Sequence, residues 1–379
     1  MTPQEMTEIR NKRIMAALNM EKPDRIPINL SGQGFFKWID PKAVLADLFR
    51  NPKYTDELTL QAFQLPIINE IDSAPMIGFT TEAGMTAFAA TSYFAKIKIP
   101  GRDLPEDAIW NIDEVGPMTA EDYDTVIDKG WEYMTAELYK RIGFDPASMP
   151  PPDMEYTNEL NAKIAALGKT SLEINPFLPM PSFEVISGAR KMPEFFKDLR
   201  RIPDKVKAVI DIVDEAAINK MVGALKSGPP CAYGFIGGTR AGSDFISARV
   251  YEKYYHPFYH KIVPAMREVN VKTWFHNDSD WSGFLQYFTE FPKAQCIFDP
   301  DHLTPMEKLK EVLGDRMCIE GNIPPALLAV GTPDDCYKAA RDLIDLMGDT
   351  GFMMGVGCGV PVNAKRENVE AVILATLGK

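Results

Sequence analysis

Three short apolar segments in the last third of the chain each end in polar side chains that could do chemistry. These side chains are an imidazole, two carboxylates, an amide and a thiol, from His276, Asp278, Glu320, Asn322 and Cys358. Imidazole nitrogen, carboxylate oxygen and thiolate sulfur are the atoms that bind zinc in proteins. Imidazole and carboxyl groups also act as general acids and bases near neutral pH. The pattern therefore predicts a catalytic or metal-binding site assembled from separate segments of the chain.

The apolar segments are typical of buried β-strands, and helical periodicity follows them. We expect strands at 25–30, 172–175, 230–235, 272–276, 295–298, 316–320 and 352–356. We expect helices at 5–20, 42–50, 55–64, 120–143, 155–167, 182–199, 204–225, 247–268, 280–290, 305–312 and 333–347. Strands that alternate with helices form parallel sheets, whose active sites lie at the carboxyl ends of the strands. The candidate residues should therefore meet at one edge of the sheet.

The regular alternation predicts an α/β protein, and more closely one (β/α)8 TIM barrel. Because no Gly/Ser-rich linker divides the chain, residues 1–379 are expected to form a single domain with an elaborated N-terminal part. Within that part, residues 67–118 are predicted to hold strands in a hairpin-like excursion. A doubly wound sheet is the alternative, although the first strand lacks the GxGxxG turn typical of that fold.

Composition limits the classes of partner. The net charge of −12 argues against nucleic acid, which needs a basic face. We find no secretory leader and no apolar run near the ~18–20 residues that span a bilayer, so we expect a soluble, cytoplasmic protein without membrane contact. The five cysteines are widely spaced, which predicts no disulfide. The oligomeric state is open, with a homodimer as the candidate assembly.

Four further residues are candidates for substrate binding. Asn29 ends the first predicted strand and could polarise a heteroatom of the substrate. Phe35 and Phe36 follow the next glycine loop and could line an apolar pocket at the barrel mouth. Arg240 lies in a glycine-rich segment after the strand at 230–235, where it could contact substrate or form an ion pair.

His256 and His260 are four residues apart, a spacing that places metal ligands on one face of a helix. Pro257 lies between them and argues against a continuous helix, and no glutamate follows the first histidine. We therefore interpret both as packing or surface residues.

Several motifs together resemble the uroporphyrinogen decarboxylase superfamily. They are Arg13, Ala16-Ala-Leu18, Lys22-Pro-Asp-Arg-Ile-Pro27, His276-Asn-Asp278, Gly321-Asn-Ile-Pro-Pro325, Val356-Gly-Cys-Gly-Val-Pro361 and Glu367-Asn-Val369. The resemblance implies a TIM barrel and one of two chemistries. The decarboxylases act on porphyrinogens without a metal, whereas the corrinoid-dependent methyltransferases use zinc and exchange methyl groups with a cobalamin-carrying protein.

The details favour the methyltransferase branch. The decarboxylases carry an arginine-rich segment after the first strand, and this chain has Ser31-Gly-Gln-Gly-Phe-Phe36 there. Those arginines would anchor a polycarboxylate substrate. The Gly-Cys-Gly-Val-Pro segment at 357–361 also matches the methyltransferases. The branch usually takes zinc on a His-x-Cys motif and a second cysteine, which makes His276 and Cys358 the matching ligands. Asp278 replaces the first cysteine, so zinc is either retained with altered Lewis acidity or lost.

The resemblance thus implies a methyltransferase acting between a small organic methyl donor and the cobalamin of a separate corrinoid protein. No DxHxxG motif for binding cobalamin occurs in the chain. His276, Asp278, Glu320 and Asn322 are the expected catalytic residues, and either Asp278 or Glu320 would complete the zinc ligands. A metal-independent decarboxylase is the alternative enzyme, and a non-catalytic binding protein on the same scaffold is the alternative of another class.

Overall fold

The central feature of the molecule is a parallel sheet, seen in a computed structural model that describes residues 1–78, 80–169, 180–228 and 231–379. Five strands lie in chain order in this sheet: β3 (Tyr233–Gly238), β4 (Lys272–Asn277), β5 (Cys296–Pro300), β6 (Cys318–Ile323) and β7 (Phe352–Val356). All four neighbouring pairs are parallel. Their carboxyl ends therefore lie at the same edge, as predicted.

The predicted first strand extends this sheet beyond β7. Ile28 forms a parallel bridge with Met354, and the amide of Asn29 donates to the carbonyl of Met354 at 2.8 Å. On the other side of the same segment, the amide of Asp72 donates to the carbonyl of Ile28 at 2.8 Å. Chain segments near both ends of the sequence thus lie side by side.

Asp72 anchors this N-terminal segment. Its fully buried carboxylate accepts hydrogen bonds from Arg13 at 2.5 Å, from Arg25 at 2.7 Å and from the amide of Ile28 at 2.9 Å. Arg13 lies on helix α1 (Pro3–Leu18). Because a buried charge is costly unless it is paired, this cluster fixes α1 and the first strand relative to each other.

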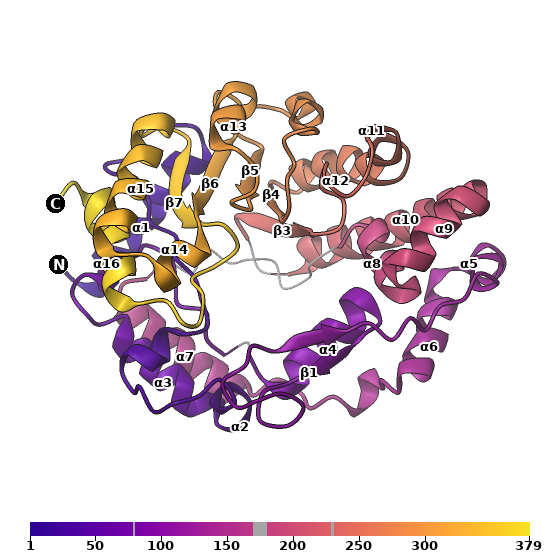
Figure 1. Ribbon diagram of the computed structural model, residues 1–379, viewed down its shortest axis with the longest axis horizontal. Helices are drawn as coiled ribbons and strands as arrows, with labels where there is room; N and C mark the ends of the chain where they lie inside the picture. The colour runs from indigo at the N-terminus through magenta and orange to yellow at the C-terminus, as the bar shows by residue number, and fades with distance from the viewer. Residues whose placement is uncertain (79, 170–179, 229–230) are drawn as a thin grey trace.

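Helices precede and alternate with the strands of the C-terminal half and lie around the sheet (Figure 1). They are α8 (Ser182–Arg190), α9 (Met192–Arg201), α10 (Pro203–Ser227), α11 (Ala248–Val250), α12 (His256–Glu268), α13 (Met306–Leu313), α14 (Pro325–Val330), α15 (Pro333–Met347) and α16 (Arg366–Leu377). A π-helix, η4 (Tyr251–Tyr255), joins α11 to α12, and a 3-10 helix, η5 (Leu285–Glu290), lies between β4 and β5. The amphipathic pattern of α15 buries Cys336, Ala340 and Leu343, and a Thr332–Asp335 capping box begins it.

The N-terminal part contains more helix than predicted. Its elements are α2 (Asp47–Arg50), α3 (Pro52–Ala62), α4 (Glu82–Tyr93), α5 (Asp122–Lys129), α6 (Trp131–Ile142), α7 (Met154–Ala166) and the 3-10 helices η1 (Phe35–Trp38), η2 (Ile68–Glu70) and η3 (Pro146–Ser148). Strands β1 (Lys96–Lys98) and β2 (Asn111–Asp113) form an antiparallel pair, which confirms the hairpin-like excursion. Helix α4 occupies a region where we predicted strands, and that prediction was wrong. Thr81 caps α4, and its alanines favour helix.

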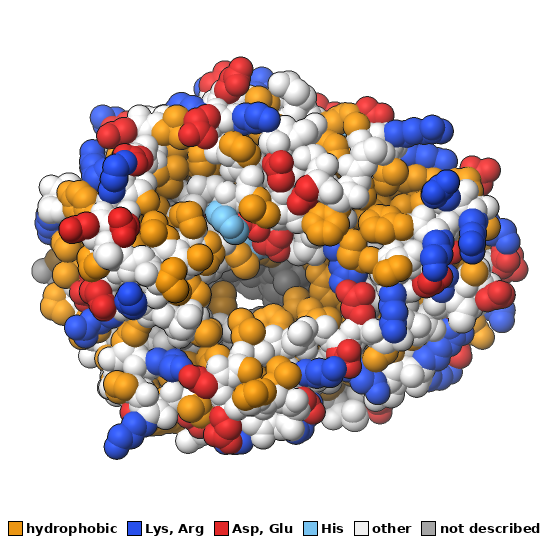
Figure 2. All heavy atoms as spheres, viewed as in Figure 1, with side chains coloured by type: hydrophobic (Ala, Val, Ile, Leu, Met, Phe, Trp, Pro, Cys, Tyr) orange, Lys and Arg blue, Asp and Glu red, His pale blue; other side chains and the backbone are white. Residues whose placement is uncertain are grey.

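The α/β fold with a parallel sheet is confirmed. The predicted strand at 172–175 lies outside the described residues, so closure into an eight-stranded barrel stays a prediction. Figure 2 shows the molecule from the same side as Figure 1. This face is hollowed at its centre, with hydrophobic and acidic side chains around the hollow. Among the described residues, no helix combines the length and apolar character needed to cross a bilayer.

Candidate metal-binding active site

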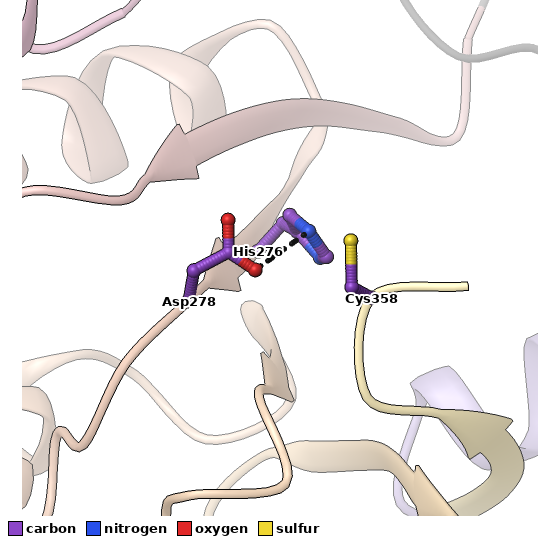
Figure 3. Close-up of side chains that lie close together, drawn as sticks. All are labelled: His276, Asp278 and Cys358. Atoms are coloured by element: carbon purple, nitrogen blue, oxygen red, sulfur yellow. Dashed lines mark ion pairs between the residues drawn. The ribbon is translucent and has the colours of Figure 1, made fainter. Parts of the chain in front are cut away.

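Three of the predicted residues come together beyond the carboxyl ends of β4 and β7. One donor atom from each of His276, Asp278 and Cys358 can be chosen so that all three lie within 4.8 Å of one another. The imidazole lies between the carboxylate and the thiol (Figure 3), with Nε2 3.5 Å from Oδ1 of Asp278. The amide of Asp278 donates to the carbonyl of Gly238 at 2.9 Å, which fixes the start of the loop after β4.

Asp299 orients the imidazole of His276. The two residues are opposite each other in the register of β4 and β5, and Nδ1 lies 2.6 Å from Oδ2 of Asp299. The ring of Phe235 stacks on the imidazole, with centroids 5.2 Å apart. A carboxylate on Nδ1 selects the tautomer that leaves Nε2 available, as in many zinc sites. Nε2 is the nitrogen that faces Asp278.

Cys358 reaches the site from a strained turn. It is exposed and has a φ of +90°, a conformation that residues with a Cβ rarely adopt. Neighbouring backbone bonds hold the turn, from Gly357 to Ile323 at 3.1 Å and from Val360 to Ser31 at 2.7 Å. Strain of this kind persists where surrounding structure imposes it, and it concentrates at functional sites.

The local charges favour an ionised imidazole in the absence of a metal. Burial alone would lower the pKa of His276, but the charge of Asp299 and hydrogen bonds to Asp299 and Cys358 outweigh it, so the pKa is well above its usual value. Burial raises the pKa of Asp278, although His276 partly opposes this shift. A divalent ion could take the place of the proton on His276, because such an ion would also be attracted by the carboxylate of Asp278 and the thiol of Cys358.

The donor set fits zinc. Nitrogen, oxygen and sulfur donors converge from two strand ends, and three protein ligands leave a fourth position for water or substrate, as in catalytic zinc sites. The carboxylate of Asp299 behind His276 supplies the outer support that such sites usually have. Among the described residues, His276, Asp278 and Cys358 are the one group of three donors whose ligand atoms all lie within 4.8 Å of one another.

Glu320 lies deeper than the rim and outside this group. It is the third residue of β6 and is 5% exposed. Its Oε1 accepts a hydrogen bond from Asn29 at 2.8 Å, whereas its buried Oε2 has no hydrogen-bond partner. Burial and the nearby charge of Asp299 raise the pKa of Glu320 well above its usual value. Asp278, rather than Glu320, is therefore placed to complete a set of three ligands, and Asn29 is engaged with Glu320.

Asn322 and Arg240 make contacts that order neighbouring loops. The amide of Asn322 donates to the carbonyls of Asp301 and Thr304 at 3.3 and 3.4 Å. The guanidinium of Arg240 lies 4.7 Å from the ring centroid of Tyr93 and forms an ion pair with Glu114. Their predicted catalytic and substrate-binding roles remain predictions, since these contacts are structural.

Phe35 and Phe36 lie in the hydrophobic core. Phe35 is 1% exposed and packs against Trp38 and Phe63, with centroids 4.6 and 5.1 Å away. Phe36 is fully buried in a second cluster that includes Leu58. Contact of these rings with a substrate is not supported by this packing.

Comparisons with known proteins bear on the family and the fold. The sequence pattern of the family described as "Uroporphyrinogen decarboxylase (URO-D)" matches residues 182–376, just over half of the chain. The chain belongs to the uroporphyrinogen decarboxylase family. The predicted resemblance is thereby confirmed, and the match contains β3 to β7 with all three grouped donors.

The relatives of this chain include both methyltransferases and decarboxylases. Methylcobamide:CoM methyltransferase MtbA of Methanosarcina acetivorans is 27% identical over 137 residues, 35% of this chain and 38% of that protein. A uroporphyrinogen decarboxylase of Gloeobacter violaceus is 24% identical over 169 residues, 44% of this chain and 46% of that protein. Both alignments span less than half of the relative's length. A solved methyltransferase from Methanosarcina mazei has the same fold, with a TM-score of 0.60 and 17% identity over 97% of each chain.

Sequence reasoning missed the part that two acidic residues play in this family member. Asp299 is not among the site residues predicted from the sequence, yet it directly orients His276. Its position after the apolar run Cys296–Phe298 parallels that of His276 and was the available signal. Glu184 is fully buried and accepts from the amides of Thr239 and Arg240 at 3.0 and 2.9 Å. No feature of the helical segment around Glu184 indicated that this side chain would hold the backbone of Thr239 and Arg240.

Proposed function

We propose that the protein is a zinc-dependent methyltransferase that moves a methyl group between a small organic molecule and the cobalamin of a separate corrinoid protein. The observation that carries the proposal is the convergence of His276, Asp278 and Cys358 within 4.8 Å. The methyltransferase relatives support it, because they are named methylcobamide:CoM methyltransferases.

The chain's own residues would prepare the reacting group. A zinc ion at this site supplies Lewis acidity, which lowers the basicity of a bound substrate heteroatom. Asp299 holds the imidazole of His276 in one orientation. Cys358 faces the same space from an exposed turn, so a substrate can approach without unfolding the rim. The protein would thereby contribute binding and orientation, and the cobalamin of the partner would supply the chemistry of methyl transfer.

Charge distribution disfavours the decarboxylase alternative. Two acidic side chains, Asp278 and Asp299, lie in or beside the site, and the raised pKa of Glu320 favours its neutral form, so Glu320 supplies no cation either. A substrate carrying many carboxylates would be repelled unless cations balanced them. Arg240 is a nearby cation, but Glu114 already pairs with it and Glu184 is 3.8 Å away. A neutral or cationic methyl donor suits this environment better.

The proposal is tested by methyl exchange with free cobalamin. Purified protein loaded with zinc is mixed with cob(I)alamin and, in separate reactions, with methoxylated aromatics, methylamines or methylated thiols. Formation of methylcobalamin is followed by visible absorbance, and the reverse reaction is measured from methylcobalamin to a thiol or amine. Transfer with at least one class in either direction is expected. A porphyrinogen that loses carbon dioxide, with no methyl exchange across the whole set, would show the decarboxylase chemistry instead.

A further inference from the structure

A second cluster of side chains with metal-ligating atoms lies on the surface formed by α12 and η5, with its donor atoms less closely grouped than those at His276. His256 and His260 are one helical turn apart in α12, so they lie on one face of that helix. Pro257 occupies the first turn of α12, where proline is well tolerated, and it does not interrupt the helix as the sequence suggested. The helical histidine pair that the sequence analysis set aside is therefore present.

Glu290, the last residue of η5, completes the group. Its Oε1 lies 3.0 Å from Nε2 of His256 and 3.2 Å from a ring nitrogen of His260. Ligands about 2.0–2.1 Å from a tetrahedral zinc ion are separated from one another by roughly 3.3 Å. Both nitrogen–oxygen distances are close to that separation. The two imidazole centroids are 6.1 Å apart, so the rings must approach to share an ion. His260 is 69% exposed, which leaves its side chain free to rotate.

The nitrogen of His256 lacks a hydrogen-bond partner. Nε2 is buried, and its contact with Glu290 has the distance of an ion pair without the geometry of a hydrogen bond. A buried imidazole nitrogen that lacks a hydrogen-bond partner and lies beside a carboxylate is a suitable metal ligand.

The surroundings give an ion access to this group. A surface cavity of about 540 Å³ is lined by His260 and Glu290, and solvent can occupy the remaining coordination position there. Glu268 and Arg267 also line the cavity, so their opposite charges face the same space. Glu252 adds a further negative charge that acts on His256.

We propose that His256, His260 and Glu290 form a second binding site for a divalent transition-metal ion, with zinc as the best match to two imidazoles and one carboxylate. The ion joins the first turns of α12 to the end of η5, the elements before and after β4. This site is independent of the methyltransferase proposal, because it shares no residue with the group at His276.

The test removes the first site and counts zinc at the second. In the Cys358→Ala protein, competition with a chromophoric chelator is expected to show one zinc ion per chain. Adding His260→Ala or Glu290→Gln should weaken that binding by more than about tenfold, since losing a ligand costs more than disturbing an outer contact. Adding His302→Ala, which removes another exposed histidine, should leave it unchanged. The same series in His276→Ala guards against misfolding of Cys358→Ala.

Cobalt distinguishes the two sites by spectrum. Cobalt at the His276 site should show a thiolate charge-transfer band from Cys358, and cobalt at the second site should show only weak d–d bands. The proposal is overturned if the Cys358→Ala and His276→Ala proteins bind no zinc, or if His260→Ala and Glu290→Gln bind it as tightly as their parents.

Discussion

The imidazole of His276 and the carboxylate of Asp299 lie opposite each other on β4 and β5, with Nδ1 2.6 Å from Oδ2. Because the pairing is set by strand register, the backbone of the sheet itself determines which nitrogen of His276 faces Asp278 and Cys358. The sheet thereby positions the candidate zinc ligand before any ion binds.

Replacing Asp299 with Asn should weaken zinc binding without abolishing it. Asparagine preserves the shape but loses the negative charge behind His276, and changes of such outer contacts typically cost about 10–100-fold in affinity. Zinc titration against a chelator measures the change. Asp280→Asn is the matched control, because Asp280 accepts from Ser282 and does not touch His276. Equal loss in both variants would contradict the assignment.

Replacing Asp278 with Cys should tighten zinc binding. The variant supplies the second thiolate of the usual His-x-Cys pattern, and sulfur is a softer and stronger donor to zinc than carboxylate oxygen. We expect roughly tenfold higher affinity, equivalent to about 1.4 kcal/mol. Asp278→Asn removes the charge and should weaken binding. If the zinc affinity is the same with Asp, Cys or Asn at position 278, then the side chain at this position is not a zinc ligand.

Zinc affinity should rise with pH across the neutral range. In the metal-free protein the pKa of His276 is well above its usual value, so its imidazole carries a proton that zinc must displace. Below that raised pKa, each proton released contributes up to about tenfold in affinity per pH unit. Chelator titrations between pH 6 and pH 8, corrected for chelator protonation, provide the measurement. A flat profile would show that His276 is not the proton-releasing ligand.

Replacing Asp72 with Ala should destabilise the fold by about 3–5 kcal/mol, because three arginines, Arg10, Arg13 and Arg25, lose their buried partner. Chemical denaturation monitored by tryptophan fluorescence gives the free energy of unfolding. Asp342→Ala, which breaks an exposed ion pair with Lys338 on α15, should cost less than about 0.5 kcal/mol. Similar losses in the two variants would show that Asp72 does not anchor the first strand.

Local sequence patterns were sufficient to predict many of the strands and helices of the C-terminal half. The strand at 352–356 and the helix at 333–347 have the predicted bounds, since apolar runs and amphipathic periodicity there agree with burial. Helix α4 was missed because its alanine- and threonine-rich sequence lacks a strong amphipathic stripe. Such a segment is determined by what it packs against, which no local pattern contains.

The site was predictable where a residue's place along its own strand decided its position. His276 lies near the end of β4 and Cys358 follows β7, and their side chains do meet at the sheet edge. The role of Asp299 depends on the register between two strands, and the depth of Glu320 depends on how far β6 extends past it. These relations are set by the packing of the whole sheet and cannot be inferred from one segment.

The most direct test of the account compares zinc content and methyl exchange in the natural protein and in Cys358→Ala. The natural protein, offered zinc after purification without a chelator, should hold zinc at the His276 site and exchange methyl groups with cobalamin. Cys358→Ala should lose that zinc and the activity together while remaining folded, because the removed thiol is exposed and outside the core. Natural protein that binds no zinc at this site, or Cys358→Ala with full methyl exchange, would contradict the account.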